Sequence, residues 1–358
     1  MASHEMTADE VALYDRQIRV WGLEAQKRMR TARVLVVNLG SLSAEICKNI
    51  VLAGIGRVGS SRVTGSLTLL DSNPVSDSNR AGQFFLTKDD NGKNRAEASA
   101  PGIKALNPRV TVRVETSNIR KQSEQFFHDY DVVCLTECAL DTLIFVNEIC
   151  RKAPKPVAFF YGQVAGVNGM AFADLNEYTF IRSSTSEGGG AIEGGEEDKK
   201  TESNSVQVQA PQTVKYASVR DVFGASWKHA AAAFGRKAQA VTKTFLAFQV
   251  LLRFMDQRDR LPLSTDKRDL DECLSIREKY GKDVLTSDVL TDVVRVAGCQ
   301  LSPVAAIVGG ILGQEVLRVL SRQDVALKNI LIFNGATNEG SIKELSAEQS
   351  TSNGTFKK

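Results

Sequence analysis

The chain has 358 residues, a length that suits one large domain or two modest ones. Its hydrophobic content of 42% and charged content of 24% are ordinary for a soluble globular protein. The net charge is only +3 and the charges are interspersed, which argues against a nucleic-acid partner. The most apolar late run, Pro303–Gly313, is interrupted by Gln314 and Glu315, so we expect no membrane span.

The cysteines argue against both a zinc site and a disulfide framework. None forms a C-x-x-C pair, histidine is rare, and most cysteines lie in apolar runs, where a buried free thiol is the usual state. They are Cys47, Cys134, Cys138, Cys150, Cys273 and Cys299. The pattern predicts a reducing compartment. The first residues, Met1–Gln17, lack the apolar core of a signal peptide, so we expect a soluble intracellular protein.

Apolar runs bounded by turn signals predict strands, and helical patterns separate the early ones. The strands are Arg33–Val37, Ser66–Asp71, Arg109–Glu115, Asp131–Thr136, Val157–Tyr161 and Ile330–Phe333. The helices between them are Ala44–Ala53, Asn94–Leu106, Ser123–His128 and Leu143–Lys152. This alternation predicts an α/β fold, a doubly wound and mostly parallel sheet with helices on both faces.

A polar segment divides the chain into two parts of one domain. Residues 183–212 are largely Gly, Ser, Glu and Lys with almost nothing to bury, which predicts a disordered linker. Residues 1–182 form the first part of the α/β domain. Residues 213–358 supply a helical part and the last strands that complete the same domain.

Three helical patterns follow the linker. Trp227–Met255 is a long amphipathic pattern, and Asp269–Tyr280 is a second helix. The third, Pro303–Leu320, has Ser302 as its expected N-cap and Pro303 at its first position. Its small residues, Gly309 and Gly313 among them, are spaced to let another backbone approach closely.

The turn after the first strand looks like a nucleotide-binding turn that has lost glycines. A dinucleotide-binding fold has the motif G-x-G-x-x-G between this strand and the following helix. In this chain the three glycine positions are Asn38, Gly40 and Ser43. An acidic residue is expected about 20 residues further on, and Asp71 fits if the nine residues Arg57–Gly65 are set aside. Those nine residues are either a surface excursion or translated non-coding sequence.

Several blocks in the correct order resemble the ubiquitin-like-protein activating enzymes, a family with a ThiF-like fold. They are YDRQIRVWGLEAQKRMRTARVLVV at Tyr14–Val37, AEICKNIVLAGI, SLTLLD, NRAEAS at Asn94–Ser99, DVVCLTEC at Asp131–Cys138 and SPVAAIVGGILGQEVLRVLS at Ser302–Ser321. Within the family, the resemblance is to a smaller subunit without the nucleophilic thiol. It implies a heterodimer with a larger, cysteine-bearing subunit that adenylates the C-terminal glycine of SUMO and passes SUMO to a conjugating enzyme. It also implies a nuclear as well as cytoplasmic location.

The resemblance explains the lost glycines. Family members pair two related adenylation domains, and only one keeps a working ATP site. Asn38 and Ser43 stand where that site needs glycine, and Asp71 survives where active halves hold the ribose. Active halves also carry an acidic residue after the fourth strand, a position that falls on Cys138, with Asp141 nearby. We therefore expect no cofactor or metal in this chain, and ATP and magnesium in the partner subunit.

The same resemblance gives Arg16 a role in catalysis. In the family, the arginine of the YDRQIR block reaches across the dimer to the phosphates of the ATP that the partner binds. The plain alternative is a surface arginine paired with Asp15 or Glu24. Gln17 and Arg19 are weaker candidates for a role at the partner's ATP.

Two other functions stay open at this stage. The strand–turn–helix with Asp71 also suits a dinucleotide-binding oxidoreductase, although that enzyme needs the missing glycines. A non-catalytic scaffold of another activating enzyme would leave Arg16 idle. A cysteine nucleophile in this chain is not expected, because Glu137 beside Cys134 and Cys138 would raise a thiol pKa.

Overall fold

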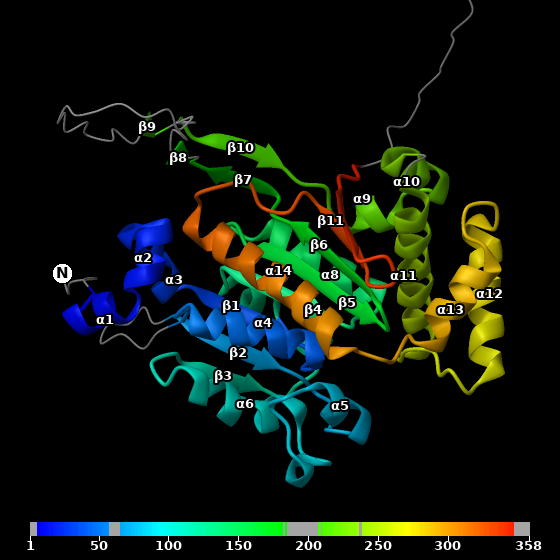
Figure 1. Ribbon diagram of the computed structural model, residues 1–358, viewed down its shortest axis with the longest axis horizontal. Helices are drawn as coiled ribbons and strands as arrows, with labels where there is room; N and C mark the ends of the chain where they lie inside the picture. The colour runs from blue at the N-terminus through cyan, green and yellow to red at the C-terminus, as the bar shows by residue number, and fades with distance from the viewer. Residues whose placement is uncertain are drawn as a thin grey trace, which may run out of the picture.

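A computed structural model describes residues 6–56, 65–181, 183–184, 207–208, 210–235 and 238–346. Figure 1 shows a central sheet with helices packed on both of its faces. The sheet has eight strands in the order β12-β11-β6-β5-β4-β1-β2-β3. Their bounds are β1 Arg33–Val37, β2 Ser66–Leu70, β3 Val112–Glu115, β4 Val132–Thr136, β5 Ala158–Ala165, β6 Asn168–Asp174, β11 Ile330–Asn334 and β12 Glu339–Lys343.

The sheet is mixed: five neighbouring strands pair in parallel, and the other three are antiparallel. Strands β3, β2, β1, β4 and β5 pair in parallel. Strands β6, β11 and β12 then continue the sheet as antiparallel neighbours of β5 and of one another. The predicted α/β fold with a mostly parallel sheet is confirmed, and the structure adds the antiparallel strands β6 and β12, which were not predicted from the sequence.

Each face of the sheet carries its own core. In β1, Val34 and Val36 join one hydrophobic cluster while Leu35 and Val37 join the other, because successive side chains of a strand point to opposite faces. The first face is covered by α3 Leu23–Thr31, α4 Ser41–Leu52, α6 Arg95–Leu106 and α14 Ser302–Ser321. The core on the second face includes residues of α7 Glu124–His128, α8 Leu140–Lys152, α9 Val219–Gly224, α10 Trp227–Phe234, α11 Gln239–Arg258, α12 Lys267–Gly281 and α13 Ser287–Arg295. Helices α12 and α13 pack on α11 rather than on the sheet (Figure 1).

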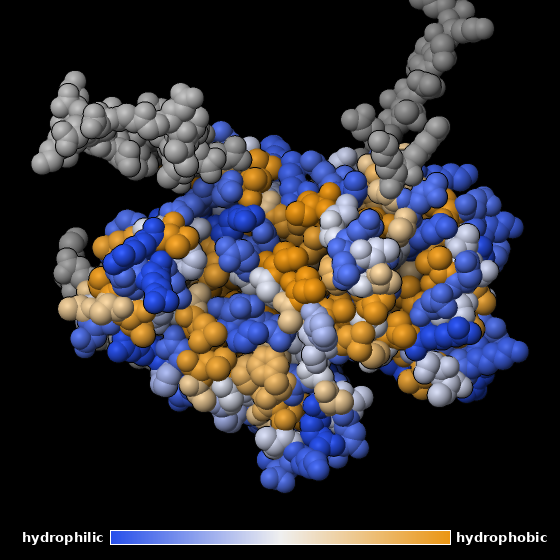
Figure 2. All heavy atoms as spheres, in the orientation of Figure 1, coloured by the Kyte–Doolittle hydropathy of each residue, from blue (hydrophilic) through white to orange (hydrophobic). Residues whose placement is uncertain are grey.

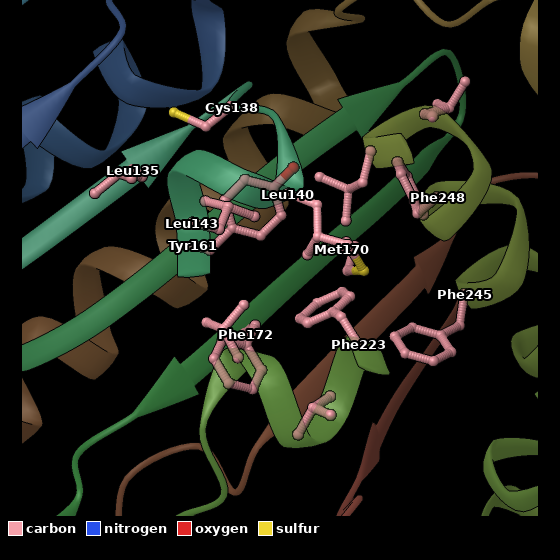
Figure 3. Packing of buried hydrophobic residues seen from close by; sticks show 14 of the residues in the cluster. Leu135, Cys138, Leu140, Leu143, Tyr161, Met170, Phe172, Phe223, Phe245 and Phe248 are labelled. Atoms are coloured by element: carbon pink, nitrogen blue, oxygen red, sulfur yellow. The ribbon is translucent and has the colours of Figure 1, made fainter. Parts of the chain in front are cut away.

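Aromatic side chains tie the late helices to the sheet on the second face. Figure 3 shows Phe172 of β6, Phe223 of α9 and Phe245 of α11 together in this core. The ring centroids of Phe172 and Phe223 are 5.5 Å apart, and those of Phe223 and Phe245 are 5.7 Å apart. Edge and tilted contacts of this kind stabilise the packing beyond the area they bury.

The predicted linker lies mostly outside the described residues, but its ends are placed. Strand β8 Ser183–Ser184 pairs antiparallel with β9 Gln207–Val208. Strand β7 Glu177–Phe180 pairs with β10 Gln212–Lys215, so an ordered strand begins at the last residue of the predicted linker. The chain after the linker returns to the sheet of the first part through β11, next to β6.

The structure corrects two predicted helix boundaries. The long pattern Trp227–Met255 is two helices, α10 and α11, because Gly235 takes a φ of 81° and ends α10. Ser302 is not the N-cap of α14: the helix begins at Ser302 itself, and its N-cap is Leu301, which makes no side-chain cap. A glycine in the left-handed region commonly ends a helix, so the sequence did contain the residue that separates α10 from α11.

Helix α14 packs closely on α4, as its small residues predict. A Cβ added at Gly309 would lie 2.6 Å from the Glu45 Cβ, and one at Gly313 would lie 2.8 Å from the Asn49 Cβ. Among the described residues, α14 is the one helix long and apolar enough to cross a membrane, but 61% of that window is buried inside the protein. Burial of this kind is typical of a core helix.

The segment Arg57–Gly65 lies outside the described residues except for Gly65. The residues that flank it are close together, since a Cβ at Gly56 would lie 2.6 Å from the Ser66 carbonyl carbon. Gly56 and Ser66, on either side of the segment, therefore lie side by side.

Candidate functional site

The turn between β1 and α4 is built around Asn38. Its φ of 63° lies in the left-handed region, which asparagine tolerates better than other residues with a Cβ. Its side-chain Nδ2 donates to the Thr136 carbonyl at 2.9 Å, to the Glu137 carbonyl at 3.1 Å and to the Cys138 Sγ at 3.2 Å. Asparagine thus takes the conformation that glycine would supply and also ties the turn to the end of β4.

Ser43 fits the position where the motif has its third glycine. Its side chain is fully buried, and its Oγ donates to the Gly40 carbonyl at 3.0 Å. The small hydroxyl is satisfied inside the first turn of α4, so it leaves no buried polar atom unpaired.

Asp71 lies at the end of β2, and its carboxylate is fully engaged with the protein. It is 0% exposed, and its oxygens accept from the Leu39 N–H at 2.6 Å and the Asn73 N–H at 2.9 Å. The guanidinium of Arg95, itself 7% exposed, completes the set with an Nε–Oδ2 distance of 2.9 Å. A residue that holds a ribose must present its oxygens outward, and this carboxylate is instead held by its own chain.

Gln300 covers the start of α4. The helix has Gly40 as N-cap, and that residue supplies no side-chain cap. The Gln300 Oε1 instead accepts from the Ser41 N–H at 2.7 Å and the Leu42 N–H at 3.2 Å. Its Nε2 donates to the Glu137 carboxylate. The amide groups that would face a phosphate in a nucleotide site are therefore occupied by a side chain of this chain.

The opposite end of α4 carries the segment with Arg16. Helices α1 Ala8–Leu13 and α2 Asp15–Trp21 lead into α3, and Gln17 of α2 donates to the carbonyl of Leu52, the last residue of α4, at 3.3 Å. Because α4 has 12 residues, it spans about 18 Å. Arg16 therefore cannot reach the turn at the start of α4 in its own chain.

Arg16 is exposed, and the two carboxylates that the sequence offered as partners are both engaged elsewhere. Asp15 pairs with Arg19 at 2.9 Å, and Glu24 pairs with Lys27 at 2.7 Å. Within the described part of the chain, Arg16 makes no ion pair or side-chain hydrogen bond. Arg19, in contrast, is a surface charge that closes an ion pair within α2.

Comparison with known proteins identifies the family of this chain. The model of the ThiF family matches residues 14–354. The chain belongs to the ThiF family. It is 37% identical over 344 residues to "SUMO-activating enzyme subunit 1" of Xenopus laevis, covering 94% of this chain and 95% of that protein. The human protein of the same name is 37% identical over 351 residues (94% and 96%), and that of Danio rerio is 34% identical over 350 (96% and 97%).

A cavity of about 740 Å³ remains beside the turn of this ThiF-family chain. Gly40, Ser41, Arg95, Glu137 and Gln300 line it at the turn, and Arg260 and the exposed Cys299 line it further out. Burial raises the pKa of the Glu137 carboxyl, although its hydrogen bond from Gln300 opposes that shift. Among the described residues, no cluster of His, Cys, Asp or Glu has the arrangement of a metal site.

The cysteines are mostly inert core thiols, as predicted. All but Cys299 are buried, and Figure 3 shows Cys138 beside Leu135 at the edge of the second core. Burial raises the pKa of Cys134 to about 12, and burial rather than Glu137 is also the first cause of the raised Cys138 pKa. Cys299 is the exception, because it is exposed.

The site residues that the sequence analysis missed are Arg95 and Gln300. Arg95 lies in the block NRAEAS, two residues after Lys93, and nothing in its local pattern indicates a partner. Gln300 follows α13 and lies 259 residues after Ser41. Cys138 lies where an acidic residue was expected, and the nearby Asp141 is exposed at the start of α8.

Proposed function

We propose that this chain is the smaller subunit of a SUMO-activating enzyme. It pairs with a larger subunit that binds ATP and magnesium and carries the nucleophilic cysteine. Together the two subunits adenylate the C-terminal glycine of SUMO, transfer it to the partner's cysteine as a thioester and pass it to a conjugating enzyme. The names of the relatives support the choice of SUMO.

The observation that carries the proposal is the position of Arg16. Its guanidinium is exposed, has no partner among the described residues, and lies at the wrong end of α4 for its own turn. In adenylation, a carboxylate attacks the α-phosphate and pyrophosphate leaves, so negative charge must be balanced. A planar and permanently charged guanidinium supplied by the other chain of a dimer does this from a fixed position.

The surface around Arg16 suits a protein partner. Leu13, the last residue of α1, and Val20, four residues after Arg16 in α2, carry side chains that are 56% and 77% exposed. Figure 2 shows hydrophobic and charged residues side by side over this part of the molecule, where Figure 1 places α1 and α2. An exposed apolar pair around an unpaired arginine is typical of an interface core.

Hydrogen bonds and burial within this chain support the proposal that the partner subunit binds the ATP and carries the nucleophilic cysteine. The N–H groups of Leu39, Ser41 and Leu42 bond to Asp71 and Gln300, so these three backbone donors are not free for a nucleotide's phosphates. These residues do not fit ATP as they stand. The buried thiols with raised pKa do not suit a nucleophile.

The test is SUMO-dependent pyrophosphate exchange by the reconstituted heterodimer. Arg16→Ala should slow exchange by about 10²–10³, the loss seen when one preorganised donor is removed from an active site. Arg16→Lys should recover part of it, because an ammonium lacks the rigid fork. Arg19→Ala is the matched control, since Arg19 is an exposed arginine of the same helix that already has a partner.

The same assay separates this proposal from a scaffold. The defect should persist at saturating ATP and should not be rescued by a normal partner subunit. If Arg16→Ala exchanges pyrophosphate at the parental rate, Arg16 has no catalytic role and the chain contributes only its pairing surface.

A further inference from the structure

We infer that a set of side-chain amides at the C-terminal end of α4 holds α2 in place and so positions Arg16 for the partner's ATP. The amides belong to Gln17, Gln26 and Asn107, which we call the α2 clamp. The inference rests on the proposed function and adds positioning residues to it. An arginine that acts across a dimer must be held accurately, because a misplacement of about 1 Å in an active site can cost about 10² in rate.

Helix α2 has little of its own to hold it. It has seven residues, and none of them is buried. A helix this short is not stable alone in water, and helices in proteins are stabilised mostly by packing of an apolar face. The position of α2, and with it that of Arg16, therefore depends on contacts with the rest of the chain.

The clamp bonds three successive carbonyls at the end of α4. Carbonyls in the last turn of a helix lack partners within it, so they are open to side-chain donors. The carbonyls of Val51, Leu52 and Ala53 accept, respectively, from Asn107 Nδ2 at 2.9 Å, Gln17 Nε2 at 3.3 Å and Gln26 Nε2 at 3.0 Å. Because α14 packs closely on α4, these bonds attach α2 to a fixed part of the core.

The clamp reaches the chain on both sides of Arg16. The Asn107 Nδ2 also donates to the Tyr14 hydroxyl at 3.0 Å, and Tyr14 directly precedes α2. An amide nitrogen has two hydrogens, so it can bond Tyr14 and α4 together. Gln17 follows Arg16 directly. Because adjacent residues of a helix do not face the same way, Gln17 bonds α4 while Arg16 stays exposed.

Gln26 ties the end of α2. Its Oε1 accepts from Trp21 Nε1 at 2.9 Å, and Trp21 is the last residue of α2. An indole N–H only donates and a carbonyl only accepts, so these two contacts fix the orientation of the buried Gln26 amide. The start, the middle and the last residue of α2 are thus all tied to the same end of α4.

The experiment measures SUMO-dependent pyrophosphate exchange by the reconstituted heterodimer at saturating ATP. Tyr14→Phe/Gln17→Met removes two polar contacts of the clamp at similar side-chain volume, and should slow exchange about tenfold, because the Arg16 guanidinium is present but no longer held. In the Arg16→Ala background the same two substitutions should have no further effect, because positioning residues act through Arg16. Gln125→Met is the matched control and should exchange at the parental rate, since the Gln125 amide bonds Asp129 beside α7, on the other face of the sheet.

The outcomes separate this inference from the proposed function. If Arg16→Ala exchanges at the parental rate, the proposed function fails and the clamp with it. If Arg16→Ala is slow, the clamp alone is overturned by a parental rate in the double variant. It is also overturned if the two substitutions slow exchange equally with and without Arg16, since they would then act independently of it. Gln17→Met alone gives the same comparison should the double variant not pair with the partner subunit.

Discussion

The two ends of α4 differ in how their polar groups are used. At its N-terminal end, the amides of Leu39, Ser41 and Leu42 bond to side chains of the same chain, and so do the Asp71 carboxylate and the Asn38 side chain to their own partners. At its C-terminal end, α2 presents Arg16 exposed and without a partner among the described residues. The first region spends its polar groups on contacts within the chain, whereas the second leaves a charge without an intrachain partner among the described residues.

The largest effect is expected from the buried ion pair of the closed turn. Arg95→Met leaves the Asp71 carboxylate, 0% exposed, without its cation, and should lower the free energy of unfolding by about 3–5 kcal/mol. Arg19→Ala breaks the exposed pair with Asp15 and should cost about 1 kcal/mol or less. Denaturant unfolding of both variants measures the contrast. Equal losses in the free energy of unfolding would mean that the buried Asp71–Arg95 pair stabilises the fold no more than the exposed Asp15–Arg19 pair does.

The next effect concerns the packing that holds α4 in place. Gly309→Ala brings a methyl to 2.6 Å from the Glu45 Cβ and 3.1 Å from the Leu42 carbonyl oxygen, and should cost about 1–3 kcal/mol. Gly310 is the matched control, because a Cβ there meets nothing within 4 Å. Gly310→Ala should leave stability equal or higher, since alanine favours a helix more than glycine does. Thermal unfolding that ranks the two variants in the reverse order would refute close packing of α14 on α4.

The smallest effect is expected far from both ends of α4. Ser184 pairs directly with Gln207 across β8 and β9, so the residues between them can be replaced by Asn-Gly, which forms a two-residue hairpin turn. This replacement should change the free energy of unfolding by no more than about 0.5 kcal/mol, because the removed stretch has almost nothing to bury. A large drop in the melting temperature would show that this stretch contributes to the core.

The sequence predicts those parts of the fold that depend on local pattern. β1 agrees at both ends with the predicted strand, since an apolar run bounded by turns is a local signal. The hairpin from β5 to β6 was missed, although Gly166 with a φ of 56° provides the two-residue turn that joins them. Continuous burial of β5 and β6 removes the alternation that identifies an antiparallel strand.

The sequence predicts only those residues of the candidate site that lie close together in the chain. Asn38, Gly40 and Ser43 are recognisable because a strand–turn–helix motif has fixed spacing. Gln300, which accepts the hydrogen bond of the Ser41 amide, lies 259 residues after it in the chain. A contact at that separation has no periodicity in the sequence, so single-sequence analysis finds the turn but not what closes it.

Titrating the full parental chain with ATP and magnesium in a calorimeter is the most direct test of whether the α4 turn is closed to nucleotide. Its amides at the α4 turn are already bonded to Gln300 and Asp71, so we predict no binding at low-micromolar nucleotide. A one-to-one isotherm with a sub-micromolar dissociation constant would contradict the claim that this half of the enzyme is closed.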